Sequence, residues 1–238
     1  MTTLSQFPKP VADQYRGKRK LFLVPTFAFP PTVPEEGQGL LESYWSDVRE
    51  HINSLERSLG TVAHVYHESL FSDGDEGMKL LEGMTPKAHS FIQAMCQSTA
   101  RLEMTEDRDI LAESSDWQRC LSVGLASQKV LNTAMEGFQE ASTRRFEHIG
   151  SRIDETLKED EAGALFISED HRVQFPPDVQ VFYVAPPALD ALKRWIGDMQ
   201  TAARSAQQAA ESGEAPEEEE TAEPEPSEAQ PGQAPEES

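Results

Sequence analysis

Two short polar segments hold the residues best suited to acid–base chemistry. His67 and Glu68 lie near the end of an apolar segment, TVAHVYHESLF at residues 61–71. Glu169 and His171 follow a second apolar segment, AGALFIS at residues 162–168. Imidazole and carboxylate groups can exchange protons with a substrate, so the two segments predict a proton-transfer site if they meet in the fold. The alternative is that these are ordinary polar residues, at a strand end and in a polar hairpin connection.

The same residues do not predict a metal site. Side chains alternate along a strand, so His64 and His67 should point to opposite faces of a regular strand. Glu169 and His171 could share a metal ion, but two of a metal's usual three or four ligands are missing nearby. Cys96 and Cys120 lack the spacing of a zinc motif, and we interpret them as reduced, buried thiols. We therefore predict no metal and no cofactor.

A basic stripe on one predicted helix is the second candidate site. The helix extends from near Ser127 towards Leu157, and the stripe consists of Arg144, Arg145, His148 and Arg152. Offsets of three, four and seven residues place such side chains on or beside one helix face. Arginine guanidinium groups match phosphate oxygens well, so the stripe predicts an anion-binding site for RNA or a nucleotide. The alternative is a solvated face whose charges are balanced by Glu147, Asp154 and Glu155.

The familiar motifs of enzymes are missing from the chain. The sequence has no P-loop, no G-x-G-x-x-G, no G-x-S-x-G, no H-E-x-x-H and no zinc-finger spacing. A phosphate cradle or a nucleophile elbow requires glycines at fixed positions, and these are lacking. The sequence therefore favours a binding role over a catalytic one.

The elements that must position these candidates alternate between strands and helices. Short apolar runs predict strands at residues 21–29, ending near Pro25, and at 61–71, 162–168 and 179–187. Apolar residues at helical spacing predict helices at about 40–59, 85–102, 110–121, 127–157 and after Pro187. A strand, a helix and a second strand form a unit with parallel strands. We predict an α/β fold with a small, mostly parallel sheet; a split into two halves is the rival arrangement.

Charge and composition change sharply along the chain. The net charge is −21, and residues 211–238 contain eleven glutamates and no large apolar residue. Such a segment cannot bury enough surface to become ordered. We predict a flexible arm at 1–19, an α/β domain at 20–200 with a helical insertion at about 78–160, and a disordered acidic tail at 201–238. Because residues 1–210 still carry −10, broad nucleic-acid binding is disfavoured, although a local basic patch is not.

The chain shows no targeting or membrane-spanning segment. Its N-terminus has no apolar run of signal-peptide length, and no stretch approaches about 18 apolar residues. We therefore expect a cytoplasmic protein that does not bind a membrane.

Residues 144–196 resemble a known family block. The order of this segment is helix, turn, the strand LFIS, an acidic loop, a second strand and a helix. It resembles a group of bacterial proteins without an assigned activity, and it is similar to the C-terminal domain of archaeal and eukaryotic class I release factors and their Pelota relatives. The resemblance implies a small α/β module that docks onto translation partners. The GGQ motif of peptide release is absent, so that activity is not implied.

The combined prediction is a non-enzymatic binding or regulatory module, associated with translation or the stress response. Its expected partners are a ribosome- or RNA-associated component and, through the acidic tail, a basic protein. The first alternative is a hydrolase or nuclease that uses the His/Glu loop after a strand. The second is a structural scaffold with an acidic tail.

Overall fold

The computed structural model describes residues 15–27, 29 and 33–212. This part of the chain is an α/β protein with five strands in one parallel sheet and six helices, which confirms the predicted fold class. The strands are β1 (Arg19–Thr26), β2 (Val62–His67), β3 (Arg101–Leu102), β4 (Ala162–Ser168) and β5 (Val179–Tyr183). The helices are α1 (Glu35–Leu59), α2 (Gly74–Met84), α3 (Pro86–Ser98), α4 (Arg108–Ser122), α5 (Gln128–Thr156) and α6 (Ala188–Ser212).

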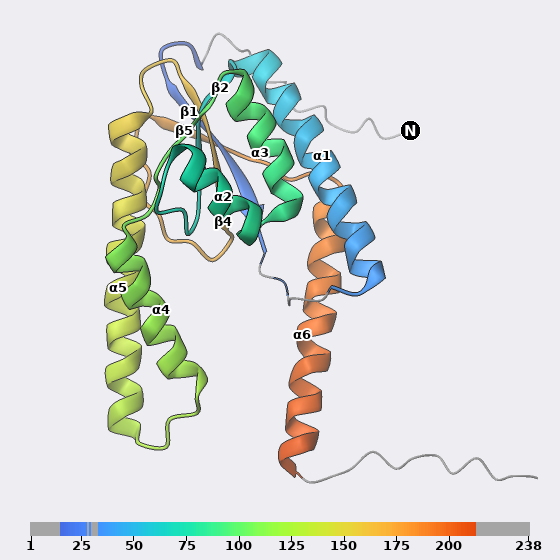
Figure 1. The fold of residues 1–238 in the computed structure, drawn as a ribbon, viewed down its shortest axis with the longest axis vertical. Helices are drawn as coiled ribbons and strands as arrows, with labels where there is room; N and C mark the ends of the chain where they lie inside the picture. The colour runs from blue at the N-terminus through green and yellow to red at the C-terminus, as the bar shows by residue number, and fades with distance from the viewer. Residues whose placement is uncertain (1–14, 28, 30–32, 213–238) are drawn as a thin grey trace, which may run out of the picture. The chain divides into compact units, whose positions relative to one another are not determined.

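The sheet has the order β3-β2-β4-β1-β5, and helices cover both of its faces (Figure 1). Apolar runs in the central strands are buried on both sides, as parallel sheets require. On one face, Phe166 of β4 packs against Trp45 of α1 and Phe91 of α3. On the other, α5 contributes Ile149 and Ile153 to a core with the alternate residues of the strands. Because successive side chains of a strand point to opposite faces, each strand contributes residues to both cores.

The connection from β4 to β5 crosses the sheet without a helix. Strand β1 lies between them and pairs in parallel with both. The loop at 169–178 is therefore a crossover, and our alternative interpretation of it as a hairpin is wrong. The physical reason is that β1, with its apolar run Leu21–Val24, is buried best between two neighbours, which leaves β5 on the far edge.

Pro25 is tolerated inside a central strand because one neighbour ends before it. We expected the strand to stop near Pro25, and β1 ends at Thr26, one residue beyond it. Leu23 O accepts a hydrogen bond from Val184 N on the β5 side, so Pro25, two residues later, presents its nitrogen to that same side. Register with β5 ends at Leu23 and Tyr183, so no ladder bond is lost. The carbonyl of Pro25 accepts a hydrogen bond of 2.5 Å from the Tyr44 hydroxyl.

Three predicted boundaries differ from the structure. The region at 78–160 is not wholly helical, because Arg101–Leu102 pair with β2 as β3, a strand too short to leave a periodic pattern. Strand β1 begins at Arg19, inside the predicted arm; residues 1–14 lie outside the described part. Helix α6 reaches Ser212, so the tail does not start at 201, because the alanine- and glutamine-rich segment there has high helix propensity. Residues 213–238 also lie outside the described part.

Chain contacts separate a first unit, up to Trp195, from a second that begins at Ile196. The first contains the sheet, α1 to α5 and the first turns of α6. In the second, the described residues are the remainder of α6. No helix among the described residues is long and apolar enough to cross a membrane.

The contact of α5 with the sheet gives the first prediction. Replacing the fully buried Ile153 by alanine should lower the free energy of unfolding by about 2–5 kcal/mol, because it removes apolar contact and leaves a cavity. Val130 lies on the same helix but is 50% exposed, so Val130→Ala should change stability by less than about 1 kcal/mol. Urea unfolding followed by circular dichroism measures both. Equal losses in the two variants would contradict the packing described here.

Candidate functional site

A groove of about 1120 Å³ lies at the carboxyl edge of the sheet. Its floor is formed where β1, β2 and β4 end, at Thr26, His67, Glu68 and Ser168. Parallel strands bring their carboxyl ends to one edge, which is where open α/β sheets bind ligands. The loop after β4 adds Asp170, Arg172 and Gln174. We call this hollow the sheet-edge groove.

Helices α4 and α5 form the far wall of the sheet-edge groove. Its apolar side chains are Leu111, Leu121, Met135, Phe138 and Phe146, and its polar ones are Ser114, Ser115, Gln118, Gln139, Ser142 and Thr143. The two helices form a hairpin that extends beyond the sheet (Figure 1). Gly137 allows them to approach, because a Cβ there would lie 2.4 Å from the Trp117 ring.

A buried ion cluster fixes the floor of the groove to α5. Arg145 Nε donates to both carboxylate oxygens of Glu106 at 2.8 Å, and Arg145 Nη2 donates to Glu68 Oε1 at 3.0 Å. Glu106 is fully buried, and Oε1 also accepts from Ser69 N at 2.9 Å. Burial opposes the charge of Arg145, yet its hydrogen bonds to the two carboxylates hold the pKa of Arg145 above its ordinary value. Glu68, Glu106 and Arg145 are called the ion cluster below.

Glu68 is engaged through both of its oxygens. While Oε1 accepts from Arg145, Oε2 accepts from Ser168 N at 2.7 Å, which ties the end of β2 to the end of β4. Its carboxylate is therefore a structural acceptor as well as a charge beside the groove. The sequence placed Glu68 near the strand end correctly, but it could not show these partners.

His67 is buried and neutral. Its Nδ1 must be protonated, because it donates at 2.5 Å to the carbonyl oxygen of Glu68. The other ring nitrogen, Nε2, is buried and has no hydrogen-bond partner among the described residues. Burial lowers the pKa of His67, and the hydrogen bond and charge of Glu68 oppose this only in part. His67 therefore presents a neutral ring with an unused acceptor.

Glu169 and His171 do not join His67 in one acid–base site. Glu169 accepts from Tyr183 Oη and from Lys193 Nζ, and neither Glu169 nor His171 lines the groove. Burial raises the pKa of Glu169, but those two hydrogen bonds bring it below the usual value. Burial lowers the pKa of His171, against the charge of Glu68. The alternate residues 170, 172 and 174 face the groove instead, which a period of two along the extended loop could have indicated.

The basic stripe of α5 faces an acidic segment of the same molecule. Arg145 binds Glu106, and Arg152 Nε donates to Met104 O at 3.2 Å. The hydrogen bond from Ile110 N is the largest cause that lowers the pKa of Asp107, and the proximity of His148 contributes in the same direction. The sequence missed this partner segment, EMTED at 103–107, although its three acidic residues were a signal.

The other arginines of the stripe also hold carboxylates. Arg144 pairs with Glu113 at 2.7 Å, and Arg152 pairs with Glu155 at 2.7 Å. Asp154, which we had expected to balance the stripe, pairs with Arg19. Anion binding by Arg144, Arg145, His148 and Arg152 stays a prediction, and an anion would have to compete with these carboxylates.

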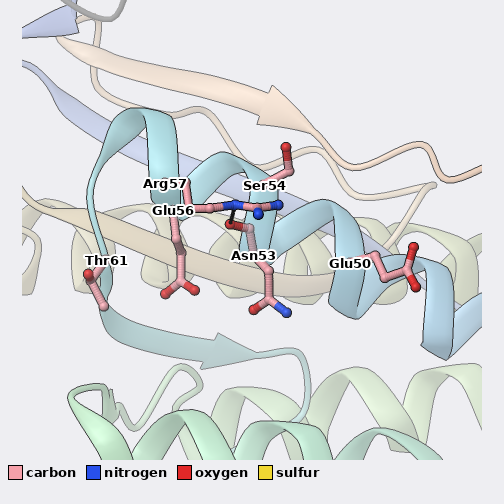
Figure 2. Close-up of a pocket in the computed structure, with 6 residues that line it drawn as sticks. All are labelled: Glu50, Asn53, Ser54, Glu56, Arg57 and Thr61. Carbon is pink, nitrogen blue, oxygen red and sulfur yellow. Dashed lines mark hydrogen bonds between the residues drawn. The ribbon is translucent and has the colours of Figure 1, made fainter.

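A second hollow, of about 740 Å³, lies where α1 ends (Figure 2). It is lined by Glu50, Asn53, Ser54, Glu56, Arg57 and Thr61. Glu56 Oε1 accepts from Val62 N at 2.9 Å, and Arg57 Nε donates to Asn53 O at 3.1 Å. Glu56 thus stabilises the turn from α1 into β2, and Arg57 stabilises the end of α1.

No three histidine, cysteine, aspartate or glutamate residues of the described chain gather closely enough to hold a metal ion. Both cysteines are free thiols: Cys96 is partly buried, which raises its pKa to about 11, and Cys120 is exposed rather than buried as we had predicted.

Comparisons with known proteins do not assign the chain to a family. No family model matches the chain, and neither a curated protein nor a solved structure matches it. The resemblance of residues 144–196 to release-factor C-terminal domains therefore stays a prediction.

The ion cluster gives the second prediction. Replacing Arg145 by methionine should lower the free energy of unfolding by about 3–5 kcal/mol, because two carboxylates lose the only ion-pair partner that they have among the described residues. Arg144→Met, next to it, removes an exposed pair and should have a much smaller effect. Chemical denaturation at pH 7 compares the two. A smaller loss for Arg145→Met than for Arg144→Met would contradict the structural role of the cluster.

The buried His67 gives the third prediction. Its folded pKa lies below the unfolded value of about 6.5, so unfolding takes up a proton as the pH falls below that value. Stability from this residue is therefore complete above pH 6.5 and decreases on acidification. His67→Phe should reduce the slope of unfolding free energy against pH by up to about 1.4 kcal/mol per pH unit below pH 6.5. Denaturation series between pH 5 and 8 measure the slopes, and identical slopes would show that folded His67 accepts a proton.

Proposed function

We propose that this protein is a non-enzymatic binding module whose sheet-edge groove receives a segment of a partner protein. The observation that carries the proposal is the combination of a wall of apolar, hydroxyl and amide side chains with a floor whose carboxylate already accepts hydrogen bonds. A site of this kind offers contact area and hydrogen bonds but little free acid–base capacity.

The expected catalytic groups are used by the fold. Both oxygens of Glu68 accept hydrogen bonds, and Glu169 is held by Tyr183 and Lys193. His171 Nδ1 accepts from Val173 N at 3.3 Å. A general base must lie within reach of the substrate's proton and be able to accept it; Glu169 and His171 do not line the groove, and both oxygens of Glu68 already accept hydrogen bonds that stabilise its charged form.

The wall of the groove suits a peptide segment. Phe138 and Leu111 supply apolar area from facing helices, while Gln118 and Gln139 can pair with main-chain groups. Met135 is 54% exposed, so the wall presents apolar surface that a partner would cover.

Electrostatics favour a protein partner over RNA. The chain carries −21, and the arginines proposed for anion binding hold carboxylates. Nucleic-acid affinity depends on a basic face that attracts phosphates. We extend the proposal to a basic partner of the translation or stress machinery, which is supported by the resemblance of residues 144–196. The acidic tail, outside the described residues, would add attraction for the same partner.

A hydrolase or nuclease is the second candidate because of one observation. His67 Nε2 is an unused acceptor in a residue that lines the groove, and a neutral imidazole can accept a substrate proton. This candidate requires the substrate to bring its reacting group to that nitrogen. Persistence of a partner complex without turnover would count against it.

Site-specific photocrosslinking in the native cell tests the proposal and is our fourth prediction. A benzoylphenylalanine at Gln118, in the groove wall, should give a discrete protein adduct that ribonuclease does not remove. The same probe at Val123, which is 71% exposed and outside the groove, should not. Phe138→Glu in the first protein should abolish the adduct, because a charge then occupies the apolar wall. A ribonuclease-sensitive adduct, or equal adducts at both positions, would overturn the proposal.

A further inference from the structure

We infer that the floor of the sheet-edge groove is a subsite for a basic side chain, lysine or arginine, of the partner segment. The inference rests on the proposed function and names the chemistry that the groove recognises. Two independent features carry it: an unbalanced negative charge in the ion cluster and the unused acceptor of His67.

The ion cluster carries one negative charge in excess. It contains two carboxylates and one guanidinium, and Arg145 is the only ion-pair partner that Glu68 and Glu106 have among the described residues. Glu106 is completely buried and Glu68 largely so. An uncompensated charge in such a place is unfavourable, and a cation bound above it would remove the imbalance. Of the two carboxylates, Glu68 lines the groove and is the one a ligand can approach.

Neighbouring cations do not supply this balance. Arg172 adds one positive charge to the lining of the groove, but it forms no ion pair with Glu68 or Glu106. The remaining charged side chains of the lining, Glu147 and Asp170, are acidic and are likewise unpaired within the described chain. His67 precedes Glu68 in the sequence, and His171 lies in the loop after β4. Both are neutral at pH 7 because burial lowers the pKa of each. The floor therefore attracts a positive group.

The unused nitrogen of His67 specifies a hydrogen-bond donor. The residue is 4% exposed and lines the groove, and its Nε2 has no donor among the described residues although its Nδ1 is satisfied. A buried acceptor without a donor is unfavourable. An ammonium or guanidinium group supplies several N–H donors, enough for His67 Nε2 and a free lone pair of Glu68. Ser69 and Ser168 belong to the same lining, and a serine hydroxyl can accept a further bond.

The wall of the groove predicts which residues flank the basic residue of the partner segment. Leu111, Phe138 and Phe146 line the groove from α4 and α5, so the positive side chain should be flanked by apolar residues. The occupant is thus a protein segment in which a lysine or arginine adjoins leucine-like or aromatic side chains. Its affinity should decrease with added salt, because the attraction is partly electrostatic.

The test selects ligands without assuming their sequence and is our fifth prediction. A random dodecapeptide library displayed on phage is selected on the immobilised full-length protein. Selected peptides should combine apolar residues with lysine or arginine. A synthetic peptide from the selection is then compared with one in which the basic residue is norleucine, by fluorescence anisotropy. The norleucine peptide should bind at least about tenfold more weakly, since it loses charge-assisted hydrogen bonds.

Variants assign the effect to the subsite. Glu68→Gln should reduce the preference for the basic peptide, whereas Glu50→Gln, which removes a carboxylate from the second hollow, should not. The peptide comparison on the unaltered protein stands even if Glu68→Gln fails to fold. Equal binding of the basic and norleucine peptides would overturn the subsite while leaving the groove as the binding site. Failure to select any peptide, or selected peptides that still bind Phe138→Glu, would instead overturn the proposed function.

Discussion

The pairing of Arg145 with Glu106 and Glu68 is the interaction on which the site depends. Glu68 follows β2, Glu106 follows β3, and Ser168 at the end of β4 donates its N–H to Glu68. One guanidinium from α5 thus joins the ends of β2 and β3, and Glu68 extends the connection to the end of β4. Because the cluster is buried, removal of one charged residue leaves the others uncompensated and destabilises the fold. The three residues therefore act as a unit. The cluster also holds the segment after β3 against α5, although β3 itself is a strand of only two residues.

Close approach of helices and loops makes the groove possible. Gly150 on α5 faces Gln174 O, and a Cβ there would lie 2.9 Å from that oxygen. The loop after β4 can therefore lie against α5 and place its alternate residues in the groove. Because the β4–β5 connection crosses β1 without a helix, this loop stays at the carboxyl edge. The hairpin of α4 and α5 then supplies the opposite wall (Figure 1).

The same cluster is the reason why we propose binding rather than catalysis. A carboxylate that accepts from Arg145 and from Ser168 N is well suited to hold a strand end, and poorly suited to take a proton from a substrate. Its charge nevertheless acts on the groove, because the pKa values of His67 and His171 both respond to Glu68. Under the proposed function, the excess charge of this structural ion cluster determines which ligands the groove accepts. This is an electrostatic form of specificity rather than a reactive one.

The sequence by itself determined the α/β class, most strands and helices, and the orientation of some side chains. Runs such as Leu21–Val24 and the helical spacing of α5 are local patterns that burial imposes on any fold. Because side chains alternate along a strand, the sequence correctly placed His64 and His67 on opposite faces of the sheet. His64 is stacked near Tyr66, and His67 is stacked near Phe166. Strand order, β3 and the partners of the α5 arginines were decided only by the tertiary structure. Arg145 and Glu106 are 39 residues apart, and no local period relates them. Pairing at such separation depends on how buried faces pack together, which a one-dimensional pattern does not record.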